Sequence, residues 1–384
     1  TTPGAPGPRP PRRASIPDEG PALRPISRAE LEQRFHTQAD GADSVVDDGV
    51  GATGTTVPAE PSSRGPELDV VFCIDCTGSM GSYIKAAKKS IGTIARTLVE
   101  QEGYDLRVGV VAYRDYNDTD GPGPFTTFPF TSRIEEMEAY FASLSASGGR
   151  QQDGAEAVEE GLKRAAWMEW RTNIQTKICI LIGDAPPHGL GEAGDTLPNG
   201  APTGVDPFKV LNQMSQKGIT IYAVGCEPAL SYYASATNFW ISAAQKTNGR
   251  AVALESAASL GDIIVGGAVE EMDLHMLQAD LCKRVREVRL SQPHLPEAEV
   301  QNQVYRSLSS SAGATRQLSM KGLESKDAHL LAAADALETA RAALAPIVKS
   351  HSMRPAPYAC YRSLAATDDP DEMPRYRCIG ATDA

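Results

Sequence analysis

The chain has 384 residues, of which 41% are hydrophobic, and a formal net charge of −12. This length suffices for one sizeable core and a smaller second one, because domains usually contain about 100–200 residues. The acidic balance argues against sequence-independent binding of nucleic acid, which needs clustered Lys and Arg side chains. No run of about 18 apolar residues occurs, so no membrane-spanning helix is expected.

Residues 1–65 are expected to form a disordered arm. Eleven of the 27 prolines of the chain lie in the first 66 residues, mixed with Gly, Ser and Ala. A segment of this composition buries too little apolar surface to offset the loss of chain entropy. Within the arm, a short helix is expected over residues 27–38, because Ser27 and Glu30 have the spacing of a capping box.

Strand-like and helix-like segments alternate over residues 66–275. Near-continuous apolar runs, which are typical of parallel strands covered on both faces, occur at residues 70–74, 108–112, 178–182 and 219–224. Residues 125–130 contain Pro129 and alternate apolar residues with Thr, which predicts an edge strand. Helices are expected near residues 133–144, 155–168, 207–216, 230–246 and 257–272. The pattern predicts one α/β domain with a doubly wound, mostly parallel sheet.

Residues 276–384 are expected to form a helical extension and a tail. Segments 272–290 and 296–308 have helical patterns, and the second begins with Pro296 at a favourable first position. A longer Ala/Leu helix is expected over residues 325–347, and a short hairpin over residues 358–379. Helix-on-helix packing is the expected role of these segments.

Residues 69–80 are the most informative segment. An apolar strand ends there at Asp75, and hydroxyl side chains follow at alternate positions, Thr77 and Ser79. Mg²⁺ and similar hard cations prefer oxygen ligands. An amphipathic helical pattern follows the loop, and in open α/β sheets ligands collect at the carboxyl ends of the strands. The sequence therefore predicts a site for Mg²⁺, or for Mn²⁺ or Ca²⁺, after this strand.

Two further loops carry acidic residues. The strand expected at residues 178–182 runs into Asp184, and the segment 148–156 opens the helix before that strand. In a right-handed doubly wound sheet, the strands that end at Asp75 and Asp184 would lie side by side. Three oxygen-bearing loops would then face one point.

In these motifs the chain resembles the von Willebrand factor A domain family. The metal-ion-dependent adhesion site of that family combines a DxSxS or DxTxS loop with two later loops. Asp75-x-Thr77-x-Ser79 matches the first loop, and Asp184 matches the third. Segments 72–81, 111–115, 184–189 and 218–224 resemble the subfamily found next to alpha-type kinases. The resemblance spans about residues 67–275.

The second loop departs from the family's pattern, which has a Thr or, in this subfamily, an Asp within a Gly-Gly-Gly-Asp-x-Pro-Glu run. Residues 150–152 intervene here, and Asp153 is the best match. The resemblance implies that Thr77 and Ser79 contact the metal directly and that the carboxylates act partly through water. A partner's Asp or Glu would fill the remaining position. Direct coordination by Asp153 would weaken the attraction for that carboxylate and make the metal mainly structural.

The resemblance implies a non-catalytic, metal-dependent protein-binding module that acts as a scaffold or as a subunit of a larger assembly. The implied metal ligands are Asp75, Thr77, Ser79, Asp153 and Asp184. One alternative is a purely structural domain with a vestigial metal site. Another is a phosphohydrolase of the haloacid dehalogenase kind with Asp75 as nucleophile. An amphipathic helix follows Asp75 in place of an extended flap, which disfavours the enzyme.

Several residues of these loops also have interpretations that require no functional site. For the first loop alone, the competing interpretation is a helix start capped by Ser79. His188 could donate to the metal loop, but a solvated or backbone-bonded loop histidine is the favoured interpretation. Cys73 and Cys76 are expected to be buried packing residues, since no second CxxC pair exists. The seven cysteines and the lack of a visible secretory signal predict a cytoplasmic protein.

Overall fold

The computed structural model describes residues 65–351, except residues 119–122, 148–153, 173, 175, 312–315 and 317. Two predicted segments lie outside the described residues. They are the arm over residues 1–65 with its helix at 27–38, of which only residue 65 is described, and the hairpin expected over 358–379. Asp153, one of the five predicted metal ligands, also lies outside the described residues.

The described strands form one sheet in the order β3-β2-β1-β4-β5-β6. All neighbouring strands run parallel except β2 and β3. The strands are β1 (Glu67–Asp75), β2 (Asp105–Tyr113), β3 (Phe125–Thr131), β4 (Thr176–Gly183), β5 (Ile219–Cys226) and β6 (Arg250–Leu254). The predicted doubly wound, mostly parallel sheet is confirmed, and so is the edge position of the strand that contains Pro129.

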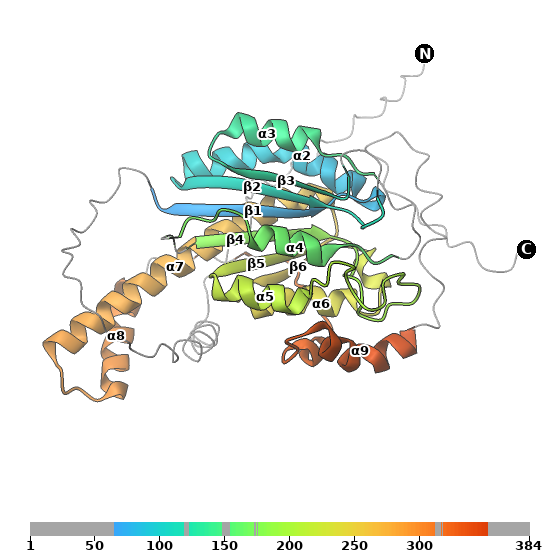
Figure 1. The fold of residues 1–384 in the computed structure, drawn as a ribbon. Coiled ribbons are helices and arrows are strands. Elements are labelled where there is room, and N and C mark those ends of the chain that lie inside the picture. The colour runs from blue at the N-terminus through green and yellow to red at the C-terminus, as the bar shows by residue number, and fades with distance from the viewer. Residues whose placement is uncertain are drawn as a thin grey trace, which may run out of the picture.

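Helices cover both faces of the sheet (Figure 1). One face carries α2 (Gly81–Arg96), α3 (Ile134–Ser143) and α7 (Leu260–Ser291). The other carries α4 (Val158–Ala166), α5 (Pro207–Gln216) and α6 (Ala236–Lys246). Shorter helical turns are η1 (Gly78–Met80), η2 (Thr97–Gln101), η3 (Leu230–Tyr232), η4 (Ala257–Ser259) and η5 (Ala328–Leu331), and the chain continues with α8 (Glu297–Ser311) and α9 (Leu337–His351).

The central strand β1 supplies both hydrophobic cores, because successive side chains of a strand point to opposite faces. Val70 and Phe72 are buried in the core beneath α2, α3 and α7. Val71 and Cys73 are buried in the core beneath α4, α5 and α6. This two-sided burial explains why the sequence of β1 is almost wholly apolar up to Asp75.

The structure differs from the predicted helices in three places. The helices expected over 257–272 and 272–290 are mostly one helix, the 32-residue α7, which follows the short turn η4. Its Gly266 and Gly267 pack closely against Leu318 and Tyr222, so no side chain would fit there. The helix expected over 325–347 is interrupted between η5 and α9, and the one expected over 230–246 is split into η3 and α6. The short strand β6 was not predicted.

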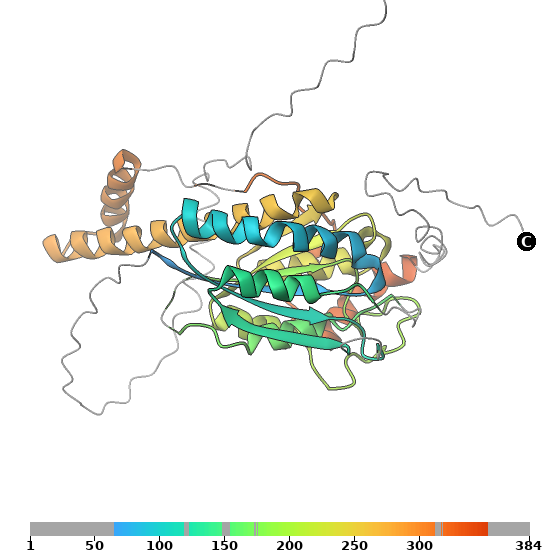
Figure 2. The same ribbon diagram turned by 90° about the horizontal axis from the view of Figure 1, so that it is seen from above.

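The C-terminal part of α7 and the whole of α8 extend beyond the end of the sheet at which β1 begins (Figures 1 and 2). Val300 and Val304 of α8 are buried, and their spacing of four residues puts them on one face of the helix. None of the described helices combines the length and the apolar character needed to cross a membrane.

Residues 316–351 return to the sheet and pack on it. Backbone hydrogen bonds join Ala253 N to Lys321 O at 2.9 Å and Leu323 N to Ala251 O at 3.0 Å, which covers the free edge of β6. Leucines of this segment are buried in the two cores, namely Leu318, Leu331, Leu337 and Leu344. Part of the predicted extension therefore completes the hydrophobic interior of the α/β domain.

A chain that ends at residue 311 is expected not to fold, whereas a chain that ends at residue 351 keeps every described contact and should fold. The shorter chain lacks the four buried leucines, and burial of each contributes about 1.5–3 kcal/mol. Their sum is comparable with the free energy of unfolding of a whole domain, about 5–15 kcal/mol. Circular dichroism during heating measures the difference. An unchanged cooperative transition in the shorter chain would contradict the prediction.

Candidate functional site

The first predicted loop leaves β1 and folds around the side chain of Asp75. The backbone N and the Oγ1 of Thr77 both donate to Asp75 Oδ1, at 2.8 and 2.6 Å. Thr77 Oγ1 lies 3.3 Å from Ser79 Oγ. Neither hydroxyl caps the helical turns that follow. A helix start capped by Ser79, the competing interpretation, is therefore wrong: the Thr77 hydroxyl contacts the carboxylate, and the Ser79 hydroxyl lies next to that of Thr77.

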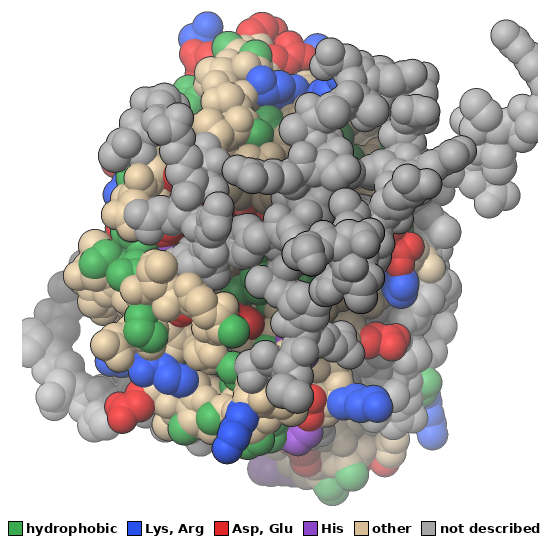
Figure 3. Space-filling model, turned by 90° about the vertical axis from the view of Figure 1, so that its right-hand side faces the viewer, with side chains coloured by type: hydrophobic (Ala, Val, Ile, Leu, Met, Phe, Trp, Pro, Cys, Tyr) green, Lys and Arg blue, Asp and Glu red, His purple; other side chains and the backbone are tan. Residues whose placement is uncertain are grey.

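The hydroxyl of Ser79 also acts on the third loop, where, against the raising effect of burial, it lowers the pKa of the Asp184 carboxyl. Strands β1 and β4 are adjacent and parallel, with Ile74 opposite Ile182, so Asp75 and Asp184 leave the sheet at the same end. We call this end the metal edge. Figure 3 looks onto it and shows described acidic and basic side chains interspersed. The structure thus brings together four of the five predicted ligands.

The fifth predicted ligand, Asp153, is not described, but the segments on both sides of it contact the other loops. Ser147 N donates to Cys76 O at 3.0 Å, next to the first loop. Glu156 N donates to Pro186 O at 3.0 Å, within the third loop. The second loop therefore begins and ends at the metal edge.

Burial of two carboxyl groups so close together changes their acidity. Burial raises the pKa of Asp75 to about 8, and the negative charge of Asp184 adds to this shift. Burial also raises the pKa of Asp184 to about 6, against the hydrogen bond from Ser79. Asp75 Oδ2 is buried and has no hydrogen-bond partner among the described residues. The charge of Arg114 lowers the pKa of Asp75 but does not cancel the effect of burial, and a bound cation would supply further positive charge.

Glu156 belongs to the same charge cluster, although the sequence analysis did not assign it to the site. Burial raises the pKa of its carboxyl group well above the usual value, and the charges of Asp75, Asp115 and Asp184 raise it further. Its Oε2 is buried without a hydrogen-bond partner in the described part of the chain. The available signal was its position in the second loop, where the resembling subfamily also has a Glu.

His188 does not have the solvated or backbone-bonded environment that was favoured for it. It is fully buried, with Nε2 2.8 Å from Asp115 Oδ1 and Nδ1 2.8 Å from Asp195 Oδ1. Burial opposes a charge on the ring, but the hydrogen bonds to both carboxylates outweigh it and raise the pKa of His188 to about 10. Residues 185–190 are all buried, so a histidine here reaches carboxylates and not water.

Cys73 and Cys76 are buried free thiols, as expected for packing residues. Burial raises the pKa of both, to about 12 for Cys76 and well above the usual value for Cys73. Thiols that hold their protons this firmly are poor nucleophiles and poor metal ligands.

The described residues contain no group of three or more His, Cys, Asp or Glu side chains placed to hold a metal ion. A divalent ion at the metal edge would thus need hydroxyl oxygens as well as the two carboxylates. The connected oxygens of Asp75, Thr77, Ser79 and Asp184 form such a mixed set, and the unsatisfied Oδ2 of Asp75 is an available ligand atom. This oxygen-only set fits Mg²⁺, Mn²⁺ or Ca²⁺.

The free energy of unfolding of the metal-free protein is expected to fall as the pH rises from 5 to 8. Folded Asp75 retains a proton that the unfolded chain has lost, and this stabilising contribution disappears as the pH rises through the raised pKa of about 8. Asp75→Asn, which cannot ionise, should reduce the fall. Urea denaturation with a chelator at pH 5, 6.5 and 8 tests this, and identical pH dependence in both proteins would refute it.

Comparison with known proteins identifies the family to which this architecture belongs. Residues 69–264 match the family model of the von Willebrand factor type A domain. Among curated proteins, the chain is 31% identical over 158 residues to alpha-protein kinase vwkA of Dictyostelium discoideum, which covers 40% of this chain and 24% of that protein. It is 24% identical over 198 residues to a putative ariadne-like RING finger protein of Acanthamoeba polyphaga mimivirus, covering 49% of this chain and 18% of that protein. The chain thus spans about a quarter or less of either relative.

Solved structures with similar folds include the pilus adhesin SpaC of Lactobacillus rhamnosus GG in its open conformation, with a TM-score of 0.39 and 12% identity over 56% of this chain and 30% of that one. A von Willebrand factor type A protein of Catenulispora acidiphila has a TM-score of 0.37 and 15% identity, covering 54% of this chain and 43% of that one. The family match spans just over half of the chain and includes β2 to β6 and all but the first two residues of β1. The chain therefore belongs to the von Willebrand factor type A domain family.

Proposed function

We propose that this domain is a non-catalytic protein-binding module that depends on a divalent metal ion, Mg²⁺ or alternatively Mn²⁺ or Ca²⁺. The proposed ligands are Asp75, Thr77, Ser79, Asp153 and Asp184. The observation that supports it is the clustering of these oxygens: Thr77 Oγ1 donates to Asp75 Oδ1 at 2.6 Å and lies 3.3 Å from Ser79 Oγ, and Asp184 leaves the adjacent parallel strand at the same end of the sheet. The cluster collects two carboxylates and two hydroxyls where adjacent parallel strands end, and oxygen ligands suit hard cations.

The proposed partner is a protein that completes the metal shell with an Asp or Glu side chain. Thr77 and Ser79 are neutral ligands, so they leave part of the charge of a divalent ion uncompensated, and the ion would attract an external carboxylate. Domains of this family often serve as protein-interaction modules. Direct coordination by Asp153 would add negative charge and reduce that attraction. In that case the alternative would hold, in which the metal is structural.

The local structure supports binding over catalysis. Asp75, the candidate nucleophile of a phosphohydrolase, is fully buried, and its Oδ1 already accepts two hydrogen bonds from Thr77. The chain passes directly through η1 into α2, which begins at Gly81. A nucleophile of that enzyme class typically precedes an extended flap, and none lies between Asp75 and α2.

The same proposal makes the protein a cytoplasmic subunit or scaffold of a larger assembly. The pair α7–α8 extends from the end of the sheet opposite the metal edge (Figure 1), so it offers a second surface whose contacts need no metal. The described cysteines are all free thiols, which suits a reducing compartment; they are Cys73, Cys76, Cys179, Cys226 and Cys282.

Calorimetric titration with Mn²⁺ is expected to show binding that tightens from pH 6 to pH 8 and releases protons. The reason is that the ion must displace the proton held by the buried carboxyl of Asp75. Asp75→Ala should abolish binding, and Ser79→Ala should weaken it by at least about tenfold. Ser82→Ala, on the exposed start of α2, is the matched control. Equal affinities for all four proteins would refute the assigned ligands.

A pull-down from native extract is expected to capture a partner in Mg²⁺ and to lose it both in chelator and with Asp75→Ala. The same loss under both perturbations follows if the ion bridges the two proteins. An unchanged set of captured proteins would select the structural alternative. The same preparations should not hydrolyse a generic phosphate ester, and turnover that depends on Asp75 would establish the phosphohydrolase instead.

A further inference from the structure

We propose that α9 stabilises the metal edge by packing on the loop that follows Asp184. This packing, which we call the latch, fixes His188 as a positioning residue for the metal ligands. The helix α9 lies beyond the family match, which ends at residue 264. The metal-dependent half of the inference rests on the proposed function, whereas its structural half does not.

The loop after Asp184 is organised around one carboxylate. Asp195 Oδ1 lies 2.8 Å from His188 Nδ1, and Asp195 Oδ2 accepts from Gly189 N at 2.7 Å. The other ring nitrogen of His188 faces Asp115 Oδ1 at 2.8 Å. Since a carboxylate accepts hydrogen bonds, both ring nitrogens donate. His188 thereby joins the loop of Asp184 to the end of β2.

The seat of α9 on this loop is made by two glycines. Gly189 and Gly200 have positive φ angles of 83° and 93°, a conformation that favours glycine. A Cβ at Gly200 would lie 2.5 Å from Leu337 Cδ2, and a Cβ at Gly189 would lie 2.9 Å from it. A Cβ at Gly189 would also lie 2.7 Å from the backbone of Gly200, so the two glycines pack against each other and Leu337 packs against both.

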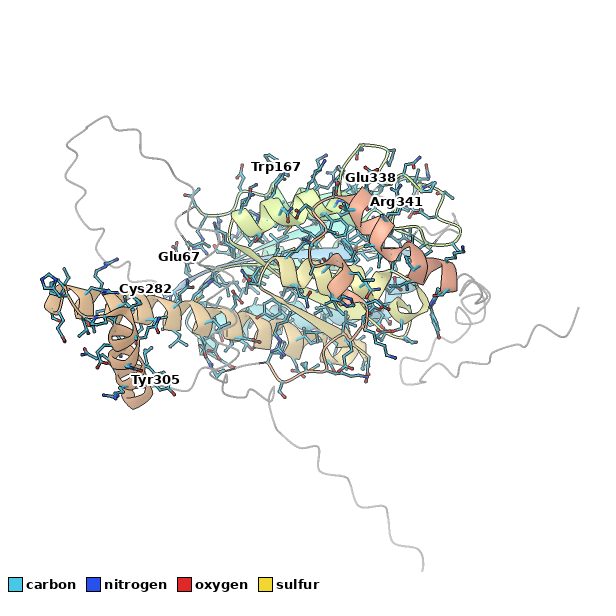
Figure 4. All side chains as sticks on the ribbon, turned by 90° about the horizontal axis from the view of Figure 1, so that it is seen from below. Glu67, Trp167, Cys282, Tyr305, Glu338 and Arg341 are labelled. Carbon is cyan, nitrogen blue, oxygen red and sulfur yellow. The ribbon has the colours of Figure 1, made fainter. Side chains whose placement is uncertain are left out.

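Polar contacts fix the same end of α9. Arg341, labelled on α9 in Figure 4, donates from Nε to Gly189 O at 2.5 Å. The carboxylate of Asp206 accepts from Leu337 N with both oxygens, at 3.1 and 3.0 Å. Asp206 Oδ1 also accepts from Phe208 N at 3.0 Å, at the start of α5. One carboxylate therefore caps the N-termini of both α5 and α9. These hydrogen bonds fix the orientation of α9, in addition to the packing of Leu337.

These contacts form one connected path from α9 to the metal edge. Arg341 and Leu337 of α9 contact Gly189. The preceding residue, His188, is hydrogen-bonded to Asp115, and the segment that contains both residues begins at Asp184. Release of α9 would free the loop between Asp184 and Gly189. By linkage, a metal ion bound to Asp184 would in turn stabilise the seat of α9, since coupling between two sites is reciprocal.

The structural half is tested by hydrogen exchange of residues 185–190 in metal-free protein. Leu337→Ala should speed exchange there by about tenfold relative to the wild type, because it removes the side chain that packs against both glycines. Leu331→Ala is the matched control, since Leu331 is equally apolar and buried but lies on η5 against α6. Equal exchange at residues 185–190 in the two variants would overturn the latch.

The metal-dependent half is tested by Mn²⁺ titration of the same proteins and of Arg341→Gln, a change at a half-buried side chain that should leave the fold intact. Leu337→Ala and Arg341→Gln should weaken Mn²⁺ binding by about fivefold or more relative to Leu331→Ala, and Mn²⁺ should slow exchange in α9 of the wild type. Equal affinities would overturn the coupling. A wild type that takes up no Mn²⁺ would overturn the proposed function, while the exchange comparison still decides the latch.

Discussion

The burial of several carboxyl groups at one end of the sheet is the constraint on which the rest of this structure depends. Removing charged groups from water is costly unless they are paired, protonated or bound to a metal ion. Asp115 and Asp195 share the buried ring of His188. Asp75 and Asp184 have no ion-pair partner among the described residues, and burial raises the pKa of both, although the charge of Arg114 partly opposes the shift at Asp75. These two carboxyl groups therefore remain incompletely compensated, which is the basis of the proposed metal site.

The fold creates this situation through strand order. β1 lies between β2 and β4, so the loops after three neighbouring strands meet at one place. Backbone hydrogen bonds then hold the loops in register: Cys76 N donates to Tyr113 O at 2.8 Å, and Ala157 N donates to Arg114 O at 3.2 Å. Because these bonds use the main chain, they leave the side chains of Asp75, Thr77 and Ser79 available to one another and to a ligand.

Local sequence patterns predicted the elements whose identity depends on local chemistry. The apolar runs identified four parallel strands, Pro129 identified the edge strand, and the alternate oxygens of residues 75–79 identified the first loop. What the patterns did not show depends on contacts between distant residues. The role of His188 needs Asp115, which is 73 residues away. The interruption before α9 coincides with a cap from Asp206, and β6 is only five residues long, so neither had a periodic signal of its own.

The two edge strands of the sheet, β3 and β6, are protected from pairing with other chains in different ways. On β3, Pro129 lacks a backbone N–H and so cannot extend a ladder of hydrogen bonds. On β6, protection comes from Lys321 and Leu323, which lie far outside the segment that matches the family. A polypeptide cut at the family boundary would expose the unpaired amide and carbonyl groups of β6. Such an edge is a template for joining another copy edge to edge, so a polypeptide shortened in this way would, besides losing its buried leucines, tend to self-associate into larger particles.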